Sequence, residues 1–77
     1  MSAKEMFEKI DYKLKYENMN YITYIDSLGR HIKFDKCEYM IEKYIEDDYG
    51  NKQQLGWLSK KELQAINKQV EELQWNK

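Results

Sequence analysis

The sequence predicts an α+β fold: an N-terminal helix, an antiparallel β-meander of three to five strands and a C-terminal helix, with both helices packed on one sheet face. Two observations support this prediction. Each end of the chain has an S-x-x-E sequence followed by apolar residues at helical spacing, whereas the middle alternates with the period of two that strands require. A chain of 77 residues is expected to form a single small globular domain, residues 1–77.

The N-terminal helix is expected over residues 3–10. Ser2 and Glu5 form a capping box, in which each side chain accepts a hydrogen bond from the backbone N–H of the other residue. The apolar residues that follow lie three or four positions apart, which places them on one helical stripe. They are Ala3, Met6, Phe7 and Ile10.

Strands are expected over residues 12–16, 21–25, 31–34, 39–46 and 55–58. Residues 21–25 are the clearest of these, because they are β-branched or aromatic throughout. Gly29 can adopt a positive φ, so a hairpin turn is expected around it. A charged loop over residues 47–51 precedes the last, short strand.

The C-terminal helix is expected to begin after Ser59, which forms a second capping box with Glu62. The helix continues toward Trp75 and carries apolar residues three or four positions apart. They are Leu63, Ile66, Val70 and Leu73. This stripe makes the helix amphipathic, so we expect it to cover the sheet.

The expected turns also predict a register, and the register predicts the two faces of the sheet. With turn tips at residues 28–29 and 36–37, the opposed pairs are Ile25 with Ile32, Thr23 with Phe34, and Phe34 with Tyr39. The face toward the helices then carries Tyr21, Thr23, Ile25, Ile32, Phe34, Tyr39, Ile41 and Ile45. The other face carries Ile22, Tyr24, His31, Lys33, Met40, Glu42, Tyr44 and Glu46.

This second face is the first candidate for a binding site. Apolar and aromatic side chains lie among charges on it, a composition typical of protein-binding surfaces. The residues expected to contact a protein partner are Ile22, Tyr24, Met40 and Tyr44. Two alternatives are that these side chains only stabilise cross-strand pairs, or that a homodimer buries the face.

Nucleic-acid binding is the alternative function. Basic residues alternate with aromatic ones along the first strands, as they do in stacking platforms. The residues expected to contact nucleic acid are Lys13, Lys15, Arg30 and Lys33. Against this hypothesis, the chain has one arginine and a net charge of −1, and lysines also alternate with apolar residues in any half-buried strand.

The residues do not predict catalysis, a metal site or a cofactor. His31 is the only histidine and Cys37 the only cysteine, too few for a zinc site and without an arrangement typical of a catalytic pair. The acidic loop at residues 46–51 lacks the spacing of a calcium-binding loop. We therefore expect a protein that is not an enzyme.

Three segments of the chain, residues 3–9, 32–36 and 62–73, resemble small uncharacterised proteins encoded by phages and prophages of low-GC Gram-positive bacteria. Those proteins often have glycine where this chain has Asp11 and Gln74. The resemblance implies a small accessory protein in the cytoplasm of a bacterial host, but it supplies no activity or site residue. It also implies a mode of action, because small phage proteins often bind and inhibit a host or defence protein, as anti-CRISPR proteins do.

The cysteine content and the lack of apolar segments also indicate the cytoplasm. One cysteine allows no internal disulfide, which fits a reducing compartment. No stretch approaches the about 20 apolar residues of a membrane-spanning helix. The first residues contain no apolar core of a signal peptide.

Overall fold

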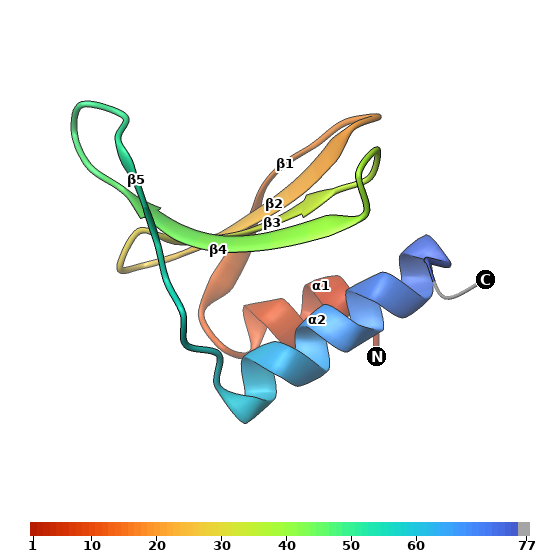
Figure 1. Ribbon diagram of the computed structural model, residues 1–77. Coiled ribbons are helices and arrows are strands. Elements are labelled where there is room, and N and C mark those ends of the chain that lie inside the picture. The colour runs from red at the N-terminus through yellow and green to blue at the C-terminus, as the bar shows by residue number, and fades with distance from the viewer. Residues whose placement is uncertain (76–77) are drawn as a thin grey trace.

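The computed structural model describes residues 1–75, which form two helices and five strands (Figure 1). The helices are α1 (Ala3–Glu8) and α2 (Lys60–Leu73). The strands are β1 (Tyr12–Glu17), β2 (Tyr21–Asp26), β3 (Arg30–Asp35), β4 (Met40–Glu46) and β5 (Lys52–Gln54). Both predicted capping boxes are present, and each one begins its helix.

The predicted α+β fold is confirmed. The strands form one antiparallel sheet in the order β1-β2-β3-β4-β5, so each strand pairs with its neighbours along the chain. The two helices pack against each other beneath one face of the sheet, and the strands bend away from them (Figure 1). We call the face without helices the open face; the bend makes it concave.

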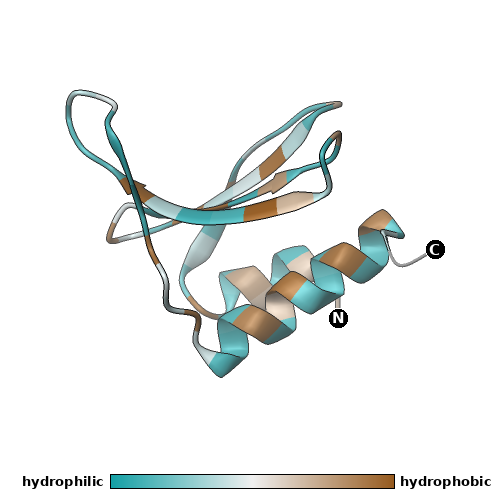
Figure 2. Ribbon diagram, viewed as in Figure 1, coloured by the Kyte–Doolittle hydropathy of each residue, from teal (hydrophilic) through white to brown (hydrophobic). Residues whose placement is uncertain are grey.

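Apolar side chains are distributed as this two-layer arrangement requires. Figure 2 shows apolar positions that recur along α2 at helical spacing, whereas the loop between β4 and β5 is hydrophilic. The core lies between the helices and the sheet. Its fully buried members are Phe7, Tyr12, Ile22, Tyr24, Ile32, Phe34, Ala65 and Ile66.

Aromatic contacts attach α1 to the sheet. The ring of Phe7 stacks on that of Tyr24, with centroids 4.0 Å apart and an interplanar angle of 21°. The same ring meets Tyr12 and Phe34 edge-on, at 5.7 Å and 6.2 Å. A helix of six residues is not stable alone, so these contacts hold it in place.

The predicted register of the first hairpin is wrong by one residue. Ile25 lies opposite His31, because the turn is a loop of three residues and not of two. Asp26 stabilises the longer turn: its carboxylate accepts the backbone N–H groups of Leu28 at 3.0 Å and of Arg30 at 2.8 Å.

A slip of one residue exchanges the two faces of β2, since successive side chains point to opposite sides of a strand. Ile22 and Tyr24, predicted on the open face, therefore point toward the helices, and they are 4% and 3% exposed. Tyr21, Thr23 and Ile25, predicted to face the helices, lie on the open face.

The second hairpin differs from the predicted one by two residues. Phe34 lies opposite Ile41 and not Tyr39, because the loop contains four residues. A slip of two residues keeps each side chain on its face, so Ile32, Phe34, Ile41 and Ile45 lie on the helix side, as predicted. Tyr39 lies in the turn itself, with a φ of 55°.

Two element boundaries also differ from the predictions. The first helix ends at Glu8 and not at residue 10. The short last strand is β5 (Lys52–Gln54), whereas residues 55–58 connect it to α2 without forming a strand.

A buried polar network fixes the start of α2 against the sheet. Glu62 accepts a hydrogen bond from the Tyr12 hydroxyl at 2.5 Å and lies 3.0 Å from the Lys43 ammonium. The ammonium also donates to the Trp57 carbonyl at 2.7 Å. Burial raises the pKa of Glu62, but the hydrogen bonds from Tyr12, Ser59 and Lys43 outweigh it and lower the pKa to about 2.

Candidate functional site

The structure does not bring together the four residues predicted to bind a protein partner. Ile22 and Tyr24 lie in the core, between the sheet and the helices, where a partner cannot contact them in this fold. Met40 and Tyr44 lie on the open face, as predicted. Met40 is 62% exposed, whereas Tyr44 is only 4% exposed. Tyr44 is covered because its ring stacks on His31, with centroids 4.7 Å apart.

Three of the four residues predicted to contact nucleic acid lie on the open face. The register places Lys13 and Lys33 there. The Lys15 ammonium reaches a β3 side chain on the same face. Arg30 lies on the helix side instead, where its Nε donates to Asp26 at 2.5 Å, so the structure does not bring it together with the lysines.

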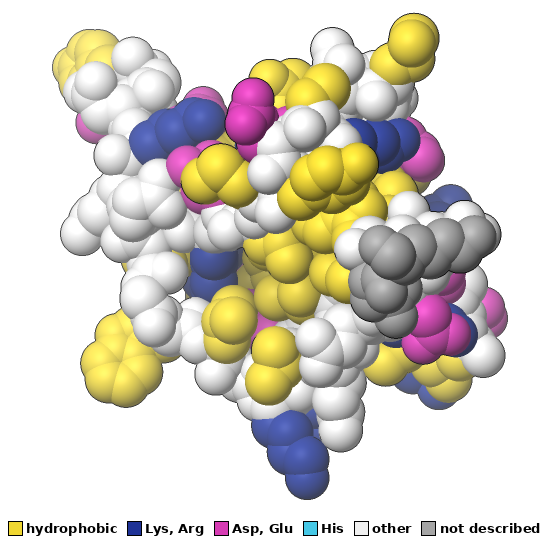
Figure 3. Space-filling model, turned by 45° about the vertical axis from the view of Figure 1, so that its right-hand side comes forward, with side chains coloured by type: hydrophobic (Ala, Val, Ile, Leu, Met, Phe, Trp, Pro, Cys, Tyr) yellow, Lys and Arg dark blue, Asp and Glu magenta, His cyan; other side chains and the backbone are white. Residues whose placement is uncertain are grey.

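A group of exposed apolar side chains lies on the side of the molecule between β4 and α2. Figure 3 shows this side, with apolar side chains gathered around a hollow between the sheet and the helix. We call the group the apolar flank; its exposed members are Tyr39, Ile41, Trp57, Leu58 and Leu63, and it also includes Trp75, which is partly buried against the core.

The flank is open because the helices leave this end of the sheet uncovered. Ile41 points to the helix side of β4, yet it is 42% exposed. Trp57 is 85% exposed, and Leu58 and Leu63 are about half exposed. Apolar side chains of this size are rarely left in water together unless they bind something.

Hydrogen bonds and aromatic contacts hold both ends of the flank. At the start of α2, Lys43 binds the Trp57 carbonyl, and the Leu55 N–H donates to the Lys43 carbonyl at 2.9 Å. At the other end, the rings of Tyr39 and Trp75 meet edge-on at 5.5 Å. The flank is therefore a fixed surface built from two elements and the segment that joins them.

Sequence reasoning missed the flank because it assigned its members to other roles. Trp57 and Leu58 were expected in a strand, and Leu63 in the buried stripe of the last helix. Of the predicted stripe, Ile66 is buried and Val70 and Leu73 pack against the core, whereas Leu63 is 46% exposed. The other buried residues of α2 are Glu62, Ala65 and Gln69. One signal was available: Leu58 and Leu63 occupy the positions of a hydrophobic staple, before the N-cap and in the first turn, and such residues lie at a helix end and not in the core.

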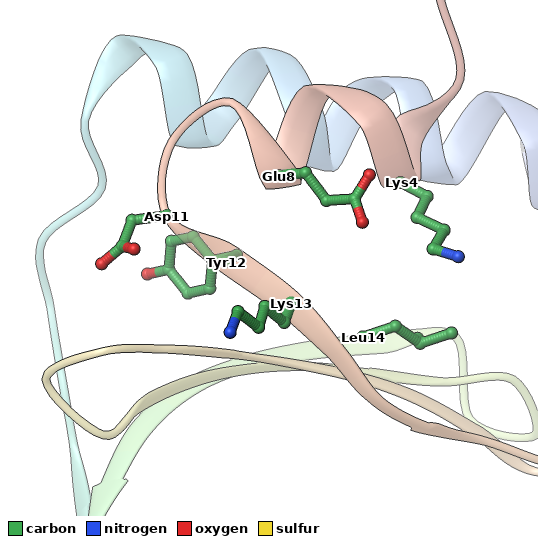
Figure 4. A pocket seen from close by; sticks show the side chains of 6 residues that line it. All are labelled: Lys4, Glu8, Asp11, Tyr12, Lys13 and Leu14. Atoms are coloured by element: carbon green, nitrogen blue, oxygen red, sulfur yellow. The ribbon is translucent and has the colours of Figure 1, made fainter.

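A cavity of about 460 Å³ lies between α1 and β1. Its lining residues, shown in Figure 4, are Lys4, Glu8, Asp11, Tyr12, Lys13 and Leu14. Two of its polar groups have partners elsewhere, since the Tyr12 hydroxyl binds Glu62 and the Asp11 carboxylate accepts from Ser27. The cavity is open to solvent and carries charges of both signs, so it does not indicate a specific ligand.

His31 and Cys37 are not brought together. His31 is the second residue of β3, whereas Cys37 lies beyond the other end of that strand. The His31 ring is 4% exposed, and burial, followed by the nearby Lys15 charge, lowers its pKa. The Cys37 thiol is exposed and donates to Asn20 at 3.2 Å.

Within residues 1–75, no group of three or more His, Cys, Asp or Glu side chains is placed to hold a metal ion. In the same part of the chain, no helix is long and apolar enough to cross a membrane. Comparison with known proteins gives no match: no family model, no curated protein and no solved structure is similar to the chain.

Proposed function

We propose that the protein acts by binding another protein and performs no catalysis, and that the apolar flank is its contact surface. The observation that carries this proposal is the exposure of several large apolar side chains on one side of a small domain. Tryptophan and tyrosine dominate the binding energy of protein interfaces, and the flank has both.

The size of the flank supports a protein partner. The five exposed members, with Tyr39 at 68% and the others as given above, present roughly 500 Å² of surface, counting about 200 Å² for a whole aromatic side chain. A patch of about this size is the largest that typical monomeric proteins expose, and a stable interface buries about 800 Å² per partner. Met40, next to Ile41 on β4, extends the flank onto the open face.

The resemblance to phage-encoded proteins supports one class of target. It favours a host or defence protein that the chain would inhibit, in the manner of an anti-CRISPR protein. This part of the proposal depends on the resemblance alone.

The proposal predicts that capture of a partner depends on the flank. Tagged protein is used to capture partners from bacterial host lysate treated with nuclease, and the bound proteins are identified by mass spectrometry. We expect one stoichiometric partner that is lost with the double variant Trp57→Ser/Leu63→Ser. Both side chains are substantially exposed, so the variant is expected to keep its fold, which circular dichroism checks.

Tyr49→Ser is the matched control. Tyr49 is 91% exposed but lies in the loop between β4 and β5, away from the flank (Figure 1). The control should keep the partner. If the control loses the partner and the flank variant keeps it, or if no protein survives nuclease treatment, the proposal is wrong.

A further inference from the structure

The open face is divided into two halves that differ in charge pairing. On the half formed by β4 and β5, Lys52 lies 3.7 Å from the Glu42 carboxylate. The half formed by β1, β2 and β3 carries three lysines, and none of them has a carboxylate oxygen within 4.0 Å among residues 1–75. These are Lys13, Lys15 and Lys33. This half carries these three lysines and one carboxylate, Asp35, with Glu42 opposite Lys33 on β4, so it has an excess of positive charge although the whole chain is slightly acidic.

A β-bulge brings one of these lysines onto the face. The pairing of β1 with β2 passes from Leu14 directly to Tyr16, so Lys15 is an additional residue in the strand. Its ammonium lies 3.0 Å from Nε2 of His31, two strands away. An ammonium only donates, so the histidine nitrogen accepts the bond and leaves two ammonium N–H groups of Lys15 for a ligand.

An unpartnered hydroxyl lies between the lysines. Thr23 is fully buried at the centre of this half, opposite Tyr16 on β1 and Lys33 on β3. Its Oγ1 is one of two buried side-chain polar atoms in the described part of the chain that have no hydrogen-bond partner; the other, Nδ1 of His31, lies on the same face. Buried polar atoms are nearly always paired, so an unpartnered hydroxyl here is unusual, and a ligand oxygen reaches it only if the side chains that cover it move.

Tyrosine rings lie among the lysines. Tyr16 is 40% exposed at the edge of the sheet, so its ring can meet a flat ligand group. The Tyr21 ring has the Lys33 ammonium 4.2 Å from its centroid, which holds that charge above the face.

We infer that this half of the open face binds single-stranded nucleic acid, with Lys13, Lys15 and Lys33 at the phosphates and the Tyr16 ring stacked on a base. Lysines that lack carboxylate partners neutralise phosphates, hydroxyl groups donate to phosphate oxygens, and an exposed ring stacks on any base. A single phosphate would occupy only part of a surface that spans three strands.

The test is the fluorescence anisotropy of labelled oligo-dT and oligo-U of about 12 nucleotides, a length within the usual site size. Three phosphate contacts on a single strand predict that affinity falls on the order of 20-fold between about 50 and 200 mM salt. Lys15→Gln or Lys33→Gln should weaken binding, because each removes one phosphate contact. The loss of affinity between the two salt concentrations should then be about threefold smaller than in the unmodified protein. Tyr16→Leu should weaken binding at least fivefold at constant salt.

The control is the double variant Lys60→Gln/Lys61→Gln, which removes two exposed charges from α2, on the other side of the molecule. It should bind as the unmodified protein does. Inorganic phosphate should compete only at millimolar concentrations. The inference is overturned if neither oligonucleotide binds at low salt, or if the control loses as much affinity as Lys15→Gln. It is also overturned if Tyr16→Leu has no effect and heparin binds as well as the oligonucleotides do, because the surface would then bind any polyanion.

Discussion

At the scale of single residues, the conformations of three non-glycine residues are costly. Asp11, Tyr39 and Gln74 have φ values of 74°, 55° and 62°, in the left-handed region that favours glycine. Gln74 is the C-cap of α2, and Asp11 lies just after α1.

The first prediction concerns Gln74→Gly. The variant should raise the free energy of unfolding by about 0.5–1 kcal/mol, because glycine adopts the left-handed cap without strain. Urea denaturation followed by circular dichroism measures the change. The control is Gln64→Gly in the exposed middle of α2, where glycine should lower stability by about 1 kcal/mol. Equal effects at both positions would contradict the prediction. Asp11→Gly should raise the free energy of unfolding by less, since it also removes the carboxylate that accepts a hydrogen bond from Ser27.

The second prediction concerns pH and Glu62. Its pKa falls from an ordinary value of 4.5 to about 2 in the folded state, so the unfolded state binds more protons in this range. The resulting stability is fully present above pH 4.5 and is lost as the pH falls toward 2. The loss corresponds to about 3 kcal/mol. Urea denaturation at several pH values measures it.

Glu62→Gln is the control for the pH prediction. It should be less stable than the unmodified protein at pH 7, and its stability should change much less between pH 4.5 and 2. If the free energy of unfolding of Glu62→Gln falls with pH as steeply as that of the unmodified protein, other carboxylates cause the loss of stability in acid. His31 acts in the same direction at higher pH: its lowered pKa makes stability fall as the pH drops below its ordinary value of 6.5.

At the scale of elements, α1 depends on the sheet for its existence. It has six residues, and its capping box stabilises only its first turn. The stack of Phe7 on Tyr24 is its main attachment, and a hydrogen bond from the Ala3 N–H to Glu72 ties it to α2 at 2.7 Å. We therefore expect α1 to form only when both β2 and α2 are in place.

The third prediction follows from this attachment. Phe7→Leu should lower the free energy of unfolding by about 1–2 kcal/mol, because leucine keeps the burial but loses the aromatic contacts. Met19→Leu is the control, since that side chain is 91% exposed and should not affect stability. Chemical denaturation of both variants measures the difference. A loss no larger than that of the control would mean that Phe7 does not hold the helix.

The two helices were predictable because their capping boxes and apolar spacing are local signals. The faces of β2 were not, since they depend on whether one turn has two residues or three, and Asp26 decides this through hydrogen bonds that the sequence pattern does not reveal. The bulge at Lys15 was missed for a similar reason: one additional residue leaves the alternation of tyrosine and lysine intact. The apolar flank was missed because Trp57 lies in a connection and not in a strand.

At the scale of the whole molecule, the two candidate surfaces lie on different sides. The helix layer leaves β4 uncovered, which creates the apolar flank, and the lysines lie on the open face on β1 and β3. A change on one surface is therefore not expected to alter the other. The two proposals can be tested in one protein with separate variants.

The fourth prediction concerns the exposed apolar surface of the whole molecule. The folded protein should bind the dye ANS at neutral pH, because ANS fluoresces on exposed apolar surface. Trp57→Ser/Leu63→Ser should lose more than half of this fluorescence, whereas Lys15→Gln should keep it. If the flank variant keeps its ANS fluorescence, the dye reports another surface and the flank is less accessible than the structure indicates.

The network around Glu62 also has a consequence for synthesis on the ribosome. Tyr12 and Glu62 are 50 residues apart in the chain, and Ala3 and Glu72 are 69 apart. Until α2 emerges, the sheet therefore has one face uncovered and the Tyr12 hydroxyl lacks its partner. Only the last segment supplies the carboxylate and the covering helix, so a nascent chain can hold a stable fold only once α2 has emerged.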